Sequence, residues 1–175
     1  MTEHEFIMTA FYVFLCGLFF GLMQFSYFFA LESNMSSARL TYLTTSCAWL
    51  LGILGGLDLS KKKRPTESEI TLISLLLYYV LLTMVYNNRY DNRLLPLYVI
   101  LIAGSAVYGG YFFSANQRRF SQVKHLFFWE NNGFMAGILG SFLGVTLIGE
   151  PFLLYWPLAL GCPILLLQFL ILREC

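Results

Sequence analysis

The chain has 175 residues, of which 58% are hydrophobic and only 12% are charged, and its net charge is +1. Soluble domains carry about 25% charged residues, so this composition excludes an ordinary soluble protein and is typical of an integral membrane protein. A net charge so close to zero provides no basic face that could displace many phosphate counterions, which excludes nucleic acid as a partner.

Six apolar segments follow one another along the chain. The first is long enough to cross a bilayer core about 30 Å thick at about 1.5 Å per residue. Its acidic start lacks the positive n-region of a signal peptide, so we expect it to be retained. The predicted spans cover residues 6–31, 39–57, 70–86, 94–114, 130–149 and 152–172. The sequence therefore predicts an all-α membrane protein in which one domain, residues 1–175, is a bundle of six transmembrane helices.

Glycines recur every three or four residues in the fifth span. They are Gly133, Gly137, Gly140 and Gly144, and this spacing places them on one helix face. Within lipid there is little hydrophobic reward for helix pairing, so helices associate through close backbone approach across small residues. We therefore expect the fifth span to be the central packing helix, with two G-x3-G contacts in sequence. Gly17 and Gly21 are expected to serve as packing residues in the first span.

Lys and Arg residues near the span ends are distributed unequally between the two sides. The side that holds both termini carries Lys61, Lys62, Lys63, Arg64, Arg118, Arg119, Lys124 and Arg173. The opposite side carries Arg39, Arg89 and Arg93. Because cytoplasmic loops are enriched in Lys and Arg, both termini are predicted to be cytoplasmic. The cluster at 61–64 is interpreted as a topology signal that also contacts anionic lipid, with docking of a partner protein as the alternative.

Residues that bind metals or act as nucleophiles are sparse. His4 and His125 both lie outside the predicted spans, which argues against a haem held between helices. The four cysteines lack C-x-x-C spacing, so neither a zinc site nor a structural disulfide is expected. The sequence contains no phosphate-binding loop, dinucleotide fingerprint or nucleophile motif. We therefore predict no cofactor, no metal and no catalytic residue.

A few polar residues lie inside or at the ends of the spans, where they cost free energy unless they are paired or hydrated. Gln24 lies well inside the first span. The others lie toward the predicted cytoplasmic side and could converge in one polar pocket: Asn116, Glu130, Asn131, Asn132 and Gln168. The alternative is that Glu130 and Asn132 cap the start of the fifth helix, where acidic and amide side chains satisfy unpaired N–H groups and the helix dipole.

The first and fifth spans each contain a short glycine motif with a polar residue. Gly17, Gly21 and Gln24 are similar to a G-x3-L-x2-E signature, with Gln24 in place of Glu. The stretch from Glu130 to Gly137 is similar to an N-x-x-G-x3-G element, with Glu130 in place of Asn. Both motifs resemble those of the membrane domain of bacterial spermidine-synthase-like integral membrane proteins. The resemblance implies a transporter-like helical domain, and we expect the chain in the bacterial inner (cytoplasmic) membrane.

In that family the transporter-like region is fused to an aminopropyltransferase domain, which binds decarboxylated S-adenosylmethionine and a polyamine. Here only Arg173, Glu174 and Cys175 follow the sixth span. Aminopropyl transfer is therefore not expected from this chain.

Three functions remain open at this point. The first interpretation is a non-catalytic subunit that scaffolds or anchors a larger membrane complex or a homo-oligomer. The second is a small transporter or channel for a polar or cationic solute such as a polyamine, bound by Glu130 and the neighbouring amides. The absence of a charge at mid-depth argues against this second function. The third, ranked last, is an interfacial enzyme in which Glu130 and His125 act as acid and base.

Overall fold

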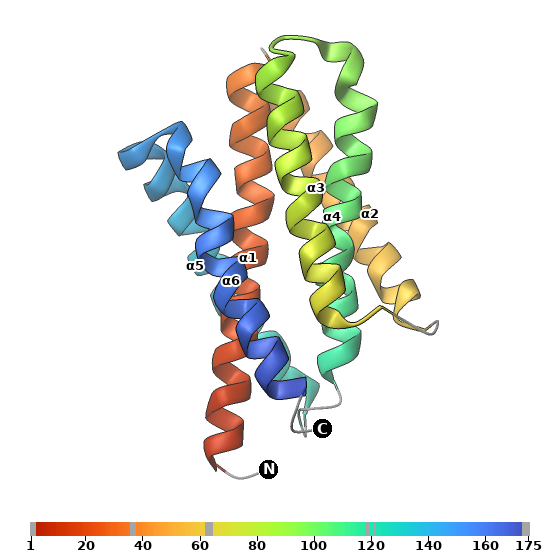
Figure 1. Ribbon diagram of the computed structural model, residues 1–175, viewed down its shortest axis with the longest axis vertical. Helices are drawn as coiled ribbons and strands as arrows, with labels where there is room; N and C mark the ends of the chain where they lie inside the picture. The colour runs from red at the N-terminus through yellow and green to blue at the C-terminus, as the bar shows by residue number, and fades with distance from the viewer. Residues whose placement is uncertain (1–2, 36–37, 62–64, 118–119, 121, 173–175) are drawn as a thin grey trace. The chain divides into compact units, whose positions relative to one another are not determined.

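The computed structural model describes residues 3–35, 38–61, 65–117, 120 and 122–172, and these are almost entirely helical (Figure 1). Within that part of the chain, six helices are long and apolar enough to cross a membrane, which confirms the predicted all-α membrane fold. The elements are α1 (Glu3–Asn34), α2 (Ala38–Leu59), α3 (Glu67–Asn87), the 3₁₀ turn η1 (Asn92–Leu94), α4 (Leu95–Asn116), α5 (Val123–Ile148) and α6 (Glu150–Leu172).

Several helices begin earlier than their hydropathy predicts, and local structure accounts for the starts of α3 and α5. α3 starts at Glu67 because Thr66 forms a capping box with Glu69: Thr66 Oγ1 accepts a hydrogen bond from the Glu69 N–H, and Glu69 Oε2 accepts one from the Thr66 N–H at 2.6 Å. α5 starts at Val123 rather than at residue 130, and Gln122 before it is in an extended conformation. The polar residues 130–132 therefore lie within α5 and do not mark its start.

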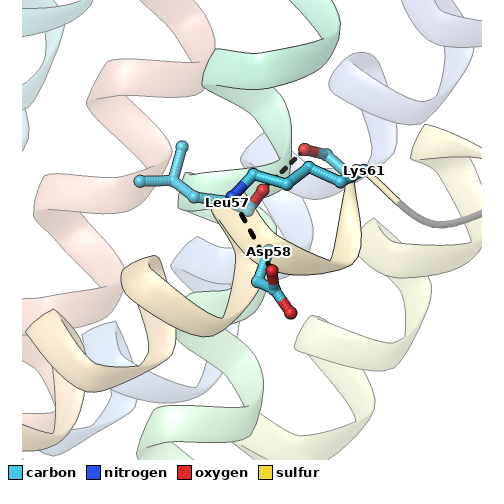
Figure 2. Close-up of polar contacts among 4 residues, drawn as sticks. Leu57, Asp58 and Lys61 are labelled. Carbon is cyan, nitrogen blue, oxygen red and sulfur yellow. Dashed lines mark hydrogen bonds and ion pairs between the residues drawn. The ribbon is translucent and has the colours of Figure 1, made fainter.

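The charged loop after α2 begins with residues that bond to one another. Ser60 Oγ donates to Leu57 O (2.8 Å), and Lys61 Nζ lies 3.7 Å from Asp58 Oδ1 at the helix end (Figure 2). Both partners of this ion pair are exposed, so water and salt screen their attraction and it contributes little to stability. The rest of the predicted lipid-contact cluster, Lys62, Lys63 and Arg64, lies outside the described residues, as do Arg118 and Arg119.

Packing divides the chain into two compact units. Unit 1 comprises Met1–Leu22 and Ser114–Cys175, and unit 2 comprises Met23–Phe113. α1 therefore contributes its first part to unit 1 and its second part to unit 2.

Unit 2 contains a close parallel pair of helices, α2 and α4. A methyl group added at Gly52 would overlap the carbonyl oxygen of Ala103, and one added at Gly56 would overlap that of Val107. Because both contacts advance in the same direction along the two helices, the helices run parallel. The glycines of these two helices thus allow backbone to lie against backbone.

Buried hydroxyl groups link α1 and α3 to α4 within unit 2. The Tyr27 hydroxyl on α1 donates to Ser105 Oγ on α4 at 2.6 Å, and Ser74 Oγ on α3 donates to the Ser105 carbonyl at 2.9 Å. The rings of Tyr27 and Tyr78 pack with centroids 5.1 Å apart. Since water is scarce in a membrane interior, such bonds satisfy polar groups that would otherwise be costly to bury.

Unit 1 contains the same kind of contact between α1 and α5. The facing helix backbone leaves no room for a methyl group at four glycines: Gly17, Gly21, Gly133 and Gly137. Gly17 faces the carbonyl oxygen of Glu130, and Gly137, further along α5, faces that of Leu18, further along α1. The two helices are therefore parallel and in backbone contact over about two turns.

The other two glycines of the expected face make different contacts. A methyl group at Gly140 would lie 3.9 Å from Leu22 Cδ2, an ordinary van der Waals distance. Gly144 faces the ring of Phe152 on α6, in a helical hairpin that turns at Gly149, whose φ is 79°. The second G-x3-G sequence thus does not extend the α1–α5 backbone contact, because by that point α6 packs against α5.

These contacts predict opposite effects for the same substitution at two sites on α5. Gly137→Ala should lower the free energy of unfolding by about 1–3 kcal/mol, because the methyl group overlaps the Leu18 carbonyl. Gly140→Ala should leave it unchanged or raise it by up to about 1 kcal/mol, since alanine favours helix and has room there. Reversible unfolding in mixed micelles measures both values. Equal losses for the two variants would contradict the proposed packing.

Candidate functional site

The buried face of α5 contains one ionisable side chain. The buried residues of this helix are Leu126, Glu130, Gly133, Gly137, Ser141 and Gly144. They recur at helical spacing and coincide with the glycines that contact α1. Glu130 is only 6% exposed, and its backbone lies against Gly17. The buried α1–α5 contact therefore includes the backbone of a residue with a carboxyl side chain.

The interpretation of Glu130 and Asn132 as helix caps is wrong. α5 begins at Val123, so Glu130 lies about 10 Å along the helix axis from its first residue. At that position the backbone N–H groups are already bonded within the helix, and no side-chain cap is required. The apolar residues among 123–129 continue the helical pattern, which explains why the polar triplet does not interrupt it.

The Glu130 carboxyl receives no hydrogen bond and no ion pair from any residue that the structure describes. Ser141 on the same buried face differs, because its Oγ donates to the Gly137 carbonyl at 2.9 Å. Removing an ionised carboxylate from water is strongly unfavourable unless a positive charge or hydrogen-bond donors compensate it. Within its own unit, Glu130 is thus a buried acidic residue whose carboxyl has no partner among the described residues.

The predicted polar pocket divides into buried and exposed residues. Asn131 and Asn132 are exposed, so they do not join the buried groups, and Asn132 Nδ2 donates to the Phe128 carbonyl of its own helix. Asn116 and Gln168 are fully or almost fully buried in unit 1. Helical geometry explains this division, because positions 131 and 132 turn away from the face that carries Glu130.

Gln168 forms a buried hydrogen bond with a residue of α1. Its Nε2 donates to the Tyr12 hydroxyl at 3.1 Å, and both residues are at most 2% exposed. The bond brings the late part of α6 beside the early part of α1. Tyr12 is thus a polar neighbour of the α1–α5–α6 packing that the sequence reasoning missed.

The proposed acid–base couple of Glu130 and His125 is not supported by the helix that carries both. Five residues separate them, which turns their side chains about 140° apart around α5. The His125 ring makes an edge contact with Phe6 at 6.1 Å between centroids. The two groups therefore face different neighbours and do not form a catalytic pair.

Gln24, the remaining polar candidate, belongs to the other unit. Gln24 is half-buried on α1 and belongs to unit 2. Among the described residues, no three His, Cys, Asp or Glu side chains are grouped so that they could hold a metal ion.

The sequence signal that could have identified Tyr12 is a tyrosine within an apolar span, since its hydroxyl needs a partner there.

Comparison of the chain with protein-family models, curated proteins and solved structures finds no match in any of the three. The resemblance to the membrane domain of the spermidine-synthase-like proteins therefore stays a prediction that rests on the two glycine motifs.

The Tyr12–Gln168 bond predicts a measurable coupling between α1 and α6. In a double-mutant cycle with Tyr12→Phe and Gln168→Leu, the interaction energy should be about 0.6 kcal/mol and at most about 1.7 kcal/mol, the range for hydrogen bonds between membrane helices. Unfolding in mixed micelles provides the four free energies. Fully additive losses would mean that the two side chains do not stabilise each other.

Proposed function

We propose that this protein moves a small cationic solute across the membrane, with Glu130 as the group that binds it. The observation that carries the proposal is a glutamate that is 6% exposed, lies within a membrane-length helix and has a carboxyl group with no partner among the described residues. Ionisable residues within membrane spans are rare because they are costly, and they commonly mark ion or substrate pathways.

The position of Glu130 within α5 supports transport better than a position at the end of a span would. At the end of a span, water would solvate the carboxyl. Because α5 begins at Val123, Glu130 lies about 10 Å along the helix axis from its first residue. A polyamine, as the family resemblance suggests, is one solute of this class.

The membrane and the orientation are parts of the same proposal. Six helices long enough to span support an integral membrane protein. We propose the bacterial inner membrane, with both termini in the cytoplasm, because Lys and Arg residues are concentrated on the side of the termini.

Neutralising the carboxyl should stop uptake. In vesicles reconstituted with the purified full chain, Glu130→Gln should lower the initial rate of polyamine uptake by more than about tenfold, because loss of one partner of a buried charge pair costs 2 kcal/mol or more. Glu150→Gln is the matched control, since it makes the same change at an exposed carboxylate. Uptake by Glu130→Gln at the wild-type rate, or no uptake by the wild type, would contradict the proposal.

A second candidate function is a non-catalytic scaffold or anchor subunit of a larger membrane assembly. It is favoured by the large apolar side chains that α5 leaves exposed. These are Phe127, Phe128, Met135, Leu139, Phe142, Leu143, Leu147 and Ile148. Lipid covers such a face as well as a partner helix does, so the face supports this function less strongly than Glu130 supports transport.

The native particle mass distinguishes the two functions. A scaffold subunit should keep larger partner polypeptides in fixed stoichiometry after mild extraction from its own membrane, as measured by native mass spectrometry. A transporter should appear as a monomer or homo-oligomer of the 20.1 kDa chain. Partners that co-purify while Glu130→Gln leaves the assembly intact would favour the scaffold.

A further inference from the structure

The charge balance around Glu130 limits the kind of ligand that its site can take. The buried polar residues described in unit 1 are Tyr12, Asn116, Glu130, Ser141 and Gln168, and only Glu130 among them can carry a charge. No buried Lys or Arg is present among the side chains described there. An ionised Glu130 therefore gives the site a charge of −1, which one unit of positive charge would neutralise.

We propose that the Glu130 site binds one singly charged cation, either a primary ammonium group or an alkali metal ion, and discriminates against divalent metal ions. The inference rests on the proposed function in that it names the ligand class of the same site. A divalent ion would leave one uncompensated positive charge in a medium of low dielectric constant, and that charge is costly to bury. A monovalent ion leaves the site neutral.

Ligand number leads to the same selectivity. Ca²⁺ takes six to eight oxygen ligands, commonly from several carboxylates, and Mg²⁺ requires a near-ideal octahedron. The part of the chain that the structure describes offers no cluster of three acidic or metal-binding side chains. One carboxylate with neutral polar groups nearby matches a weakly hydrated monovalent ion or a single –NH₃⁺ group.

Unit 1 contains neutral polar groups in its buried interior. The Tyr12 hydroxyl and the Gln168 amide are bonded to each other at 3.1 Å and are buried in the same unit as Glu130. Gly17, directly opposite Glu130, contributes no side chain that could compete for it. A polyamine would thus insert one terminal ammonium group at Glu130 and keep its other charges outside this site.

The test measures binding, separately from transport, by ligand-induced stabilisation of the full chain in detergent. The probes are the chlorides of methylammonium, potassium, sodium and magnesium, with tetraethylammonium chloride as the reference salt. Each salt is used at a concentration that supplies about 100 mM of positive charge. Tetraethylammonium has the same single charge but is bulky and has no N–H donor. The experiment compares the wild type with three variants: Glu130→Gln, Glu130→Asp and Glu150→Gln. The unfolding midpoint of each variant in the reference salt reports whether that variant folds.

We expect at least one of methylammonium, K⁺ and Na⁺ to raise the unfolding midpoint of wild type and Glu150→Gln by about 3 °C or more over the reference salt. The effective probe identifies the source of the charge, an ammonium group or an alkali ion. Glu130→Gln should lose the shift, and Glu130→Asp should keep part of it, which separates loss of charge from a folding defect. Mg²⁺ should give no shift of this kind.

Three results would overturn the inference. One is an equal shift in Glu130→Gln, which would place the ligand elsewhere on the protein. Another is a larger shift with Mg²⁺ that depends on Glu130, which would reverse the charge selectivity. The third is the absence of any shift in wild type. Binding of the expected class without uptake in vesicles would instead contradict only the proposed transport function.

Discussion

Close approach of helix backbones is the constraint on which the rest of this structure depends. Gly17 and Gly137 each face a carbonyl oxygen of the neighbouring helix with no room for a methyl group, and Gly52 and Gly56 do the same between α2 and α4. Because lipid gives little hydrophobic reward for pairing helices, this fit of backbone to backbone takes the place that an apolar core has in a soluble domain. Both units thus contain a parallel helix pair whose small residues permit contact.

The same contact creates the chemical property of unit 1. A larger residue opposite Glu130 would hold the helices apart and admit lipid or water, whereas Gly17 lets α1 lie directly against α5. Glu130 is buried, and its carboxyl has no cationic side chain or hydrogen-bond donor assigned to it among the described residues. Packing and the proposed function are linked here, because a substitution that made the Glu130 site easier to solvate would also separate the two helices.

Hydropathy and residue spacing predicted the number of membrane helices and the glycine face of α5, since both follow from local periodicity. They could not identify α1 as the partner of that face, because spacing shows which residues share a face but not what covers it. The polar triplet at 130–132 was misassigned for a related reason. Its residues suit a helix start, and only the continued helix from Val123 shows that Glu130 turns inward while Asn131 and Asn132 turn outward.

The two units differ in how their parts are ordered along the chain. Unit 2 is one unbroken stretch, Met23–Phe113, whereas unit 1 joins the first residues of α1 to everything after Ser114. As the chain is synthesised from its N-terminus, Gly17 enters the membrane with the first helix, but Glu130 follows only after the whole of unit 2 has been made. Contacts between residues so distant in sequence also close slowly. The glycine face of α1 therefore lacks its α5 partner until unit 2 has been made, and the site at Glu130 is completed only when α5 and α6 have been inserted.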